Sequence, residues 1–280
     1  MKTEATVGKS PPLYFLDTST QINRHWADEQ ISKQVRSDLA GSKLRTSIYV
    51  ERQYRYRVLN AFISAHVFVI TSDDIQDAKK RLENCRDDIG IDDLFYKFLR
   101  RLFRKYNSKK LLLRYLKRLI EVDWQNFFYD AVPKSLCDLT GCTKSADAPQ
   151  SRRGYYLTIP KKCPPNCNIC DFWKAKKEDL QNLAATDPDE SKRTTDPKGT
   201  IQKIRTEAKS ILEGKSPKGE RCRVISDAII SIEARDSYPG ITIHTMDSDF
   251  DNLKKILRTK VRFFKVDQGG GNLFSNLPSE

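Results

Sequence analysis

The chain has 280 residues, of which 50 are Lys or Arg and 37 are Asp or Glu, so its formal net charge is +13 at pH 7. That length suits one domain with a large insertion, or two domains, and the basic excess favours nucleic acid or an anionic surface as partner. No run of about 18 uncharged apolar residues is present, and the N-terminus lacks the apolar core of a secretory signal. We therefore expect no membrane span, a cytoplasmic location and reduced cysteines.

The first predicted element is an apolar strand, Tyr14 to Leu16, which delivers Asp17 at its end. Apolar residues at every third or fourth position predict a helix over 26–39. A second helix follows, because Thr46 or Ser47 is a suitable N-cap before a long periodic apolar pattern.

The alternation of strands and helices continues after this second helix. The β-branched run Val67–Ile70 predicts a strand, and the capping sequence Thr71–Asp74 predicts a further helix through Leu82. Such an alternation predicts an α/β fold with a mostly parallel sheet.

Residues 88–215 are far too long for an ordinary connection, so we expect an insertion with structure of its own, mainly helical. Within it, 95–119 carries ten Lys or Arg residues and no acid, with apolar residues at helical spacing, which predicts one basic amphipathic helix. A membrane-surface helix is the competing interpretation, but interleaved aromatic residues favour nucleic acid. The residues expected to face phosphates are Arg100, Arg101, Arg104, Lys105, Lys109, Lys110 and Arg114.

Five of the seven cysteines fall between positions 137 and 170. In a reduced compartment this density indicates a structural Zn²⁺ held by four thiolates, which would stabilise a segment poor in core residues. The predicted ligands are Cys137, Cys142, Cys167 and Cys170. Cys163 is a spare or alternative ligand. The other interpretation is a set of buried or redox-active thiols, which also suits Cys85 and Cys222.

The insertion ends in two contrasting segments. Residues 184–199 lack bulky apolar side chains and contain two Asp-Pro pairs, which predicts a linker or mobile loop. Apolar periodicity over 201–212 then predicts a helix that leads back to the core. At the far end of the chain, 268–280 is expected to be a flexible tail.

Carboxylates recur where the last predicted elements begin or end. Ser226 is suited to cap a buried helix with Asp227 in its first turn, and a strand beginning at Ile241 ends at Asp247, with Asp249 two residues further on. Together with Asp17 at the end of the first strand, these residues predict a site for a hard divalent cation such as Mg²⁺ or Mn²⁺.

Four motifs resemble those of the PIN-domain nucleases, and they occur in that family's order. They are Leu16-Asp-Thr-Ser19, Ser47-Ile-Tyr-Val-Glu51, Asp227-Ala-Ile-Ile-Ser-Ile-Glu-Ala234 and Thr245-Met-Asp-Ser-Asp-Phe250. The resemblance covers about residues 12–84 and 216–266, close to half of the chain. It implies a three-layer fold and metal-dependent hydrolysis of phosphodiester bonds.

The resemblance also implies roles for individual residues. Asp17 and Asp227 would hold the principal ion and Asp247 would complete the site, while Glu51 would bind a metal or orient the attacking water. Asp249 is either a ligand of a second ion or a helix cap. For Glu51, an ion pair with Arg55 at the i,i+4 spacing is the alternative.

The resulting organisation is a PIN-like core in two parts, 12–87 and 216–267, interrupted by the insertion at 88–215 and followed by the tail at 268–280. The implied function is that of an endoribonuclease, with RNA favoured over DNA by the resemblance alone, and a toxin or phage-defence role would suit it. The alternative is a non-catalytic nucleic-acid-binding or scaffold protein. An antitoxin, a defence-complex partner and a homodimer all remain open.

Overall fold

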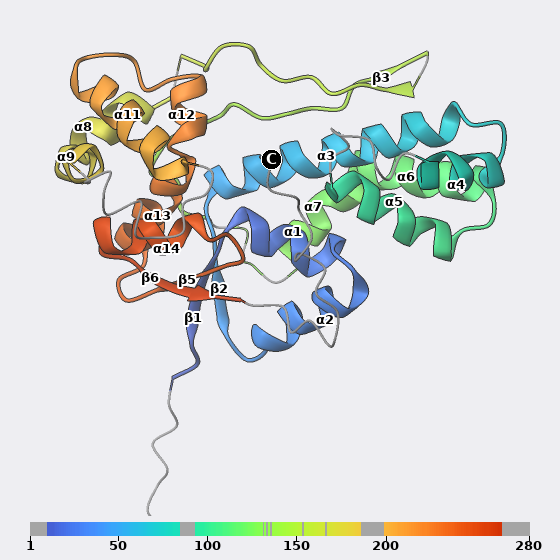
Figure 1. Ribbon diagram of the computed structural model, residues 1–280, viewed down its shortest axis with the longest axis horizontal. Helices are drawn as coiled ribbons and strands as arrows, with labels where there is room; N and C mark the ends of the chain where they lie inside the picture. The colour runs from blue at the N-terminus through green and yellow to red at the C-terminus, as the bar shows by residue number, and fades with distance from the viewer. Residues whose placement is uncertain are drawn as a thin grey trace, which may run out of the picture.

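The computed structural model describes residues 10–84 and 93–264, apart from positions 131, 133, 135, 153, 166 and 186–198. The chain has an α/β fold with a four-stranded parallel sheet in the order β2-β1-β5-β6 (Figure 1). The strands of this sheet are β1 Leu13–Leu16, β2 Lys43–Arg45, β5 Thr242–Thr245 and β6 Lys260–Phe263. The predicted α/β class is therefore confirmed.

Strand β1 lies between two parallel partners, as its apolar sequence predicts. Tyr14 pairs with Leu44 of β2 on one side and with Thr242 of β5 on the other. Phe15 and Leu16 are completely buried. Because β1 and β5 are parallel, their carboxyl ends lie at the same edge of the sheet.

The helices after β1 differ in part from the prediction. The structure has α1 Thr18–Trp26, α2 Glu29–Asp38, α3 Ile48–Ile70 and α4 Ile75–Asn84. The single helix predicted over 26–39 is wrong at its start, because Ala27 and Asp28 have extended or non-helical backbone and Asp28 caps α2. The N-cap prediction for α3 is confirmed, since the Ser47 hydroxyl accepts a hydrogen bond from the Val50 N–H at 3.2 Å.

The strand predicted at Val67–Ile70 is wrong, because these residues form the last turn of α3. A short β-branched run can form either a buried strand or a turn of a buried helix, so its composition does not distinguish the two. Here Phe62 and Val69, seven positions apart, are both buried and continue one inner face of the helix. The helix predicted after this run is confirmed as α4.

The basic segment forms two helices, so the prediction of one helix over 95–119 is wrong. The elements are α5 Asp93–Lys105, α6 Lys109–Arg118, a π-helical turn Leu119–Asp123 and α7 Trp124–Tyr129. The break falls at 106–108, where the Ser108 hydroxyl accepts a hydrogen bond from the Leu111 N–H and caps α6. A serine competes for the backbone in this way and favours a helix start over a helix interior.

The remaining described elements follow. They are the antiparallel pair β3 Gln150–Ser151 and β4 Gly154–Tyr155, then α8 Ile169–Ala175, α9 Lys177–Ala185, α11 Thr200–Leu212, α12 Glu220–Val224, α13 Ser226–Ser237 and α14 Asp249–Ile256. The helix predicted over 201–212 is confirmed. Ser226 is the first residue of α13, whose N-cap is Ile225, so the predicted cap is displaced by one residue. Most of the predicted linker, and the tail at 268–280, lie outside the described residues.

One cluster of buried apolar side chains includes residues of both the predicted core and the predicted insertion, among them Phe15, Leu59, Leu99, Leu116 and Ile229. Figure 1 shows α8, α9, α11 and α12 gathered near one end of α3, and α4, α5 and α6 near the other. Among the described residues, no helix combines the length and apolar character needed to cross a membrane. The domain boundaries predicted at 88 and 215 stay predictions.

Candidate metal centre

Three aspartates meet at the carboxyl edge of the sheet. Asp227, Asp247 and Asp249 each offer a carboxylate oxygen, and these oxygens lie within 4.8 Å of one another. The topology explains the meeting: α13 leads into β5 through a tight turn at 238–241, so the start of α13 lies near the end of β5. Both elements therefore contribute carboxylates to one edge.

Asp17 lies beside this trio at the end of β1, where it is buried and caps α1. Its carboxylate accepts hydrogen bonds from the Thr20 N–H at 2.7 Å and from the Ser19 hydroxyl at 2.8 Å. The Thr245 hydroxyl of β5 donates a third hydrogen bond at 2.7 Å. These donors orient the carboxylate, while Thr18 donates to the Gln53 side chain at 2.6 Å.

Burial and neighbouring carboxylates hinder the ionisation of aspartates at this edge, and the effect of the neighbours falls on Asp227. Burial raises the pKa of Asp17, despite the donors that stabilise its charged form. Burial, followed by the charges of Asp247, Asp17 and Asp249, raises the pKa of Asp227 to about 7. A cation bound between such carboxylates stabilises their negative charge and therefore lowers their pKa values again.

Three helices begin at the same edge. Asp17 caps α1, Asp227 lies in the first turn of α13, and Asp249 is the first residue of α14. The amino end of a helix carries partial positive charge, which stabilises each nearby carboxylate by about 0.3–1 kcal/mol. The Asp247 carboxylate accepts a hydrogen bond from the Asp249 N–H at 3.1 Å, so backbone groups also hold the pair in place.

Glu51 is not part of the group formed by the three aspartates, and its role in binding a metal or orienting water stays a prediction. It lies in the first turn of α3, and burial raises its pKa while Arg52 and Arg55 lower it. The alternative, an ion pair with Arg55, is also absent from the described residues. Arg55 pairs with Asp147 at 3.1 Å and lies 4.7 Å from the centre of the Trp124 ring.

Two of the seven basic residues predicted to contact phosphate have structural partners. Arg101 donates to the carbonyl oxygens of His25 and Ala27 at 2.8 and 3.2 Å, at the end of α1. Lys109 donates to the Ile70 carbonyl at 3.3 Å, at the end of α3, and also to that of Ser72. Both side chains therefore stabilise helix ends.

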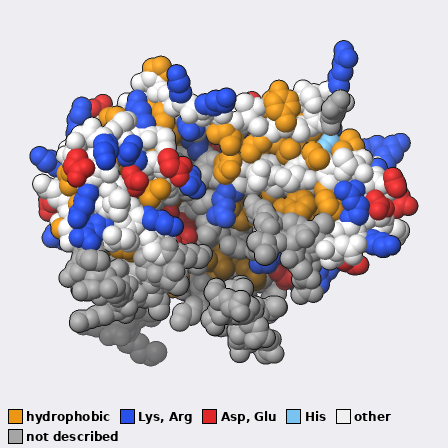
Figure 2. Space-filling model, turned by 45° about the horizontal axis from the view of Figure 1, so that its top comes forward, with side chains coloured by type: hydrophobic (Ala, Val, Ile, Leu, Met, Phe, Trp, Pro, Cys, Tyr) orange, Lys and Arg blue, Asp and Glu red, His pale blue; other side chains and the backbone are white. Residues whose placement is uncertain are grey.

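The other five predicted phosphate contacts are exposed: Arg100, Arg104, Lys105, Lys110 and Arg114. Lys105 Nζ lies 5.6 and 5.7 Å from the ring centres of Tyr106 and Tyr115. On the face drawn in Figure 2, Lys and Arg side chains are spread across the width of the molecule and do not form one continuous patch.

The predicted zinc ligands are not gathered in the described part of the chain. No three of the described cysteine sulfurs lie within 4.8 Å of one another, and all six described cysteines are free of disulfides. Burial and the nearby Glu233 raise the pKa of Cys137 to about 12, and Ser237 also approaches this thiol. Cys137 therefore has polar neighbours of its own on α13. Cys85 lies outside the described residues.

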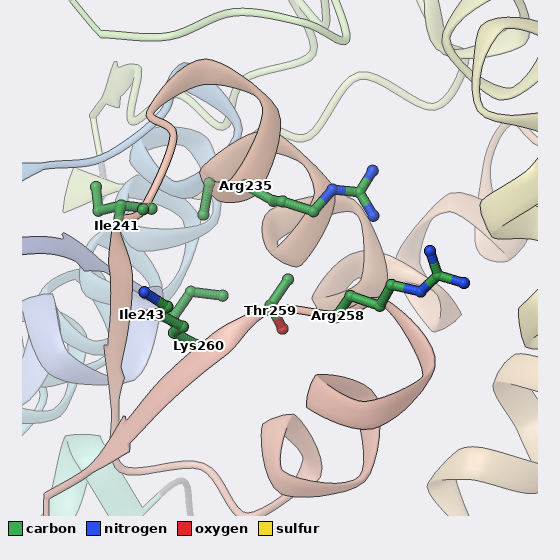
Figure 3. Close-up of a pocket in the computed structure, with 8 residues that line it drawn as sticks. Arg235, Ile241, Ile243, Arg258, Thr259 and Lys260 are labelled. Carbon is green, nitrogen blue, oxygen red and sulfur yellow. The ribbon is translucent and has the colours of Figure 1, made fainter.

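A small hollow lies at the opposite edge of the sheet. It has a volume of about 80 Å³ and is lined at the starts of β5 and β6 by residues that include Ile241, Thr259 and Lys260 (Figure 3). Arg235 at its rim pairs with Asp179 at 2.8 Å. Since the aspartates lie where β5 ends, this hollow is separate from them.

One neighbouring group was not predicted from the sequence. His244 of β5 is completely buried, with Nε2 2.8 Å from an oxygen of Asp38 and Nδ1 3.2 Å from the Thr20 hydroxyl. Thr20 in turn donates its N–H to Asp17. A histidine in the strand that leads to Asp247 is a sequence feature that could have indicated this group. Asp38, at the end of a polar helix, has no such distinguishing feature.

No family model, curated protein or solved structure matches this chain. The resemblance to PIN-domain nucleases therefore stays a prediction from the chain's own motifs.

Proposed function

We propose that this chain is a metal-dependent nuclease that hydrolyses phosphodiester bonds, with Mg²⁺ or Mn²⁺ held by Asp227, Asp247 and Asp249. The observation that carries this proposal is the approach of three carboxylate oxygens to within 4.8 Å of one another. Carboxylate oxygens are the donors that these hard cations prefer, so the residues present suit the ion.

The bound cation would neutralise charge on the phosphate and activate a water molecule. The chain's own residues prepare the site for it. Burial and the neighbouring carboxylates raise the pKa of Asp227 to about 7, so a cation bound there would displace any proton on this carboxylate. Asp17 adds negative charge beside the trio, and its three hydrogen bonds restrict how its carboxylate can rotate.

RNA is the proposed substrate in preference to DNA, because the four motifs resemble those of ribonucleases. The net charge of +13 would attract either nucleic acid and would make binding strongly dependent on salt. Binding at low salt therefore cannot test the proposal, and cleavage is the informative measurement.

The test compares two ligand variants with a matched control. Asp227→Asn and Asp247→Asn remove carboxylates of the trio, while Asp251→Asn removes an exposed carboxylate of α14 that pairs with Lys254. Each protein is incubated with labelled single-stranded and structured RNA and DNA, with Mg²⁺, Mn²⁺ or EDTA. We expect metal-dependent cleavage by wild type and Asp251→Asn, and a loss on the order of 100-fold in the two ligand variants.

Circular dichroism and a binding assay show whether each variant is folded and still binds nucleic acid. Cleavage that survives EDTA, or that the ligand variants retain, would contradict the proposal. Binding without any cleavage by wild type would favour the second candidate, a non-catalytic nucleic-acid-binding protein, which the basic composition supports.

A further inference from the structure

A hairpin of the predicted insertion lies along α3 (Figure 1). It comprises residues 143–162, apart from position 153, and is named the α3 hairpin. Its two arms are joined at Asp147 and Thr158, whose backbone groups exchange hydrogen bonds at 2.9 and 2.8 Å, and again at β3 and β4 near its tip. These pairings give the segment a defined shape on the surface of the molecule.

Side-chain contacts fix the α3 hairpin to the helix at two points. Near the base of the hairpin, Asp147 pairs with Arg55 at 3.1 Å. Near its tip, the buried Tyr155 ring meets the His66 ring edge to face, with 5.2 Å between the ring centres, and the Tyr155 hydroxyl donates to Glu121. The two helix positions are about 16 Å apart along the axis of α3. The hairpin is therefore held in one orientation along the helix.

This orientation directs one set of side chains to solvent. Successive residues of a strand point to opposite faces, so the burial of Tyr155 leaves Tyr156 outside, where it is 52% exposed. Ile159, Lys161 and Lys162 of the same arm are exposed as well. Figure 2, in which the top of Figure 1 is turned forward, shows hydrophobic side chains gathered in a band on this face, with Lys and Arg side chains beside it.

The charge of the α3 hairpin is almost entirely positive. Residues 143–162 include five Lys or Arg residues and one acid, Asp147, whose charge is offset by Arg55. Within the described part of the chain, no ion pair involves Arg152, Lys161 or Lys162. All three side chains are exposed, so their charges are available to a polyanion.

The first turns of α3 connect the α3 hairpin to the candidate metal centre. Arg55 faces the hairpin, whereas Gln53 accepts a hydrogen bond at 2.6 Å from Thr18, the residue that follows Asp17. At about 100° per residue around the helix, Tyr56 lies between the directions of these two side chains. Tyr56 is 43% exposed. An exposed aromatic ring therefore stands on the helix surface between the hairpin and the aspartates.

We propose that the α3 hairpin and Tyr56 form a binding surface for single-stranded nucleic acid, which leads the strand to the metal centre. Tyr156 and Tyr56 stack on unpaired bases, while Arg152, Lys161 and Lys162 contact phosphates. Stacking and charge suit a single strand, because every base has an aromatic face and every nucleotide carries a phosphate. The inference rests on the proposed function only in taking nucleic acid as the ligand.

Other anionic partners suit this surface less well. A duplex keeps its bases stacked on one another, so it offers phosphates to the lysines but no free base to Tyr156. A membrane surface is bound through an extended apolar face. Among the described residues of the α3 hairpin, however, Tyr156 and Ile159 are the exposed large apolar side chains. The aromatic residue and the cations together therefore favour a single strand.

The first test measures the stacking. Fluorescence anisotropy follows the binding of labelled single-stranded RNA, single-stranded DNA and a duplex of equal length to the full-length chain in EDTA. We expect Tyr156→Ala to weaken binding of single strands by about 5- to 100-fold and to change duplex binding little. Tyr156→Phe keeps the ring and should match wild type. The matched control is Leu212→Ala, which truncates an exposed side chain at the end of α11 and should also match wild type.

The second test measures the phosphate contacts. Lys161→Gln and Lys162→Gln should each reduce the slope of log affinity against log salt by about 0.7 for single strands. Lys43→Gln makes the same change of charge at the start of β2, on the opposite edge of the sheet from the aspartates, and should leave the slope unchanged. These variants also test the surface if Tyr156→Ala fails to fold, which circular dichroism detects.

Wild-type affinity in Tyr156→Ala, an equal loss in Tyr156→Phe, or a larger loss for duplex than for single strands would overturn the proposal. So would unchanged salt slopes in both lysine variants. Vesicles of anionic phospholipid provide a further arm: if Tyr156→Ala weakens binding to vesicles and not to oligonucleotides, the surface binds membranes.

The outcome is separable from that of the nuclease proposal. A wild type that binds single strands as expected but never cleaves them contradicts the nuclease proposal and leaves this surface in place. Metal-dependent cleavage by a wild type whose binding does not depend on Tyr156 or the lysines contradicts this surface alone.

Discussion

The Thr245 hydroxyl donates a hydrogen bond to the Asp17 carboxylate between β5 and β1, with 2.7 Å between Oγ1 and Oδ2. The same hydroxyl accepts the Asp247 N–H at 2.9 Å. A single side chain therefore couples the buried carboxylate at the end of β1 to the backbone that carries Asp247.

Replacing this hydroxyl tests the coupling. Thr245→Val keeps the shape of the side chain but leaves the Asp17 carboxylate and the Asp247 N–H each without one partner. We expect the free energy of unfolding to fall by about 1–3 kcal/mol and Mn²⁺ affinity to fall by roughly 10- to 100-fold. Urea unfolding and calorimetric titration measure the two effects. Thr245→Ser, which keeps the hydroxyl, should resemble wild type, and equal behaviour of the two variants would refute the coupling.

The raised pKa of Asp227, about 7, predicts that cation binding depends on pH. Below that pH a proton competes with the cation for the carboxylate, so Mn²⁺ affinity should fall by up to about tenfold per pH unit as the pH is lowered. Calorimetry at pH 6 in buffers of different ionisation enthalpy should detect proton release of up to about one per ion. Asp227→Asn should lose this proton release, and an unchanged value in the variant would assign it to another group.

Buried Glu233 on α13 predicts a pH-dependent stability that is separate from the metal centre. Burial, with a smaller contribution from Asp138, raises its pKa from the ordinary 4.5 to about 7, against the lowering effects of Ser47, the Leu139 backbone and Arg52. Between these two pH values the folded chain retains a proton that the unfolded chain has released. The free energy of unfolding therefore falls as the pH rises through this window, and the loss is complete above about pH 7.

Glu233→Gln imitates the protonated side chain and removes this dependence. We expect the variant to be more stable than wild type at pH 8 by about 2 kcal/mol, with little difference at pH 5. Urea unfolding at the two pH values gives the comparison. A difference between the proteins that is the same at both pH values would show that packing, and not ionisation, is the cause.

Two arginines of α5 should affect different properties: Arg101 the stability of the fold, and Arg104 the binding of nucleic acid. Arg101→Ala removes the donor to the His25 and Ala27 carbonyls, so we expect a loss of about 1–2 kcal/mol in the free energy of unfolding. Arg104→Ala removes an exposed charge, so stability should change by less than about 0.5 kcal/mol.

Nucleic-acid affinity gives the second half of this comparison. Arg104→Ala should weaken binding and reduce the slope of log affinity against log salt by about 1, as for one lost phosphate contact. Fluorescence anisotropy at several salt concentrations measures the slope. If Arg101→Ala reduces the slope and Arg104→Ala does not, the division between structural and phosphate-binding arginines is wrong.

Patterns local in the sequence predicted several elements well. The apolar run at Tyr14–Leu16 and the β-branched run before Asp247 are strands, and the periodic segment at 201–212 is a helix. In each case the backbone hydrogen bonds, the apolar face and the turn residues at the ends favour the same element.

The errors arose where local patterns are ambiguous. Val67–Ile70 has strand composition, but it continues the buried face of α3, and only its neighbours in the fold decide between the two. The basic run over 95–119 keeps its helical period through the break at 106–108, where the Ser108 cap separates α5 from α6. The spacing of the apolar residues does not reveal that one helix ends there and another begins.

The sequence by itself determined that carboxylates stand at the ends of strands and at the starts of helices, because caps and strand ends depend on near neighbours along the chain. Tertiary structure decided which of them meet. Asp227 joins Asp247 and Asp249, whereas Glu51 does not. Tertiary structure likewise assigned Arg101 to carbonyl groups 74 and 76 residues away. Contacts between residues so distant in sequence depend on how helices pack on the sheet, which no local pattern of charge or hydrophobicity specifies.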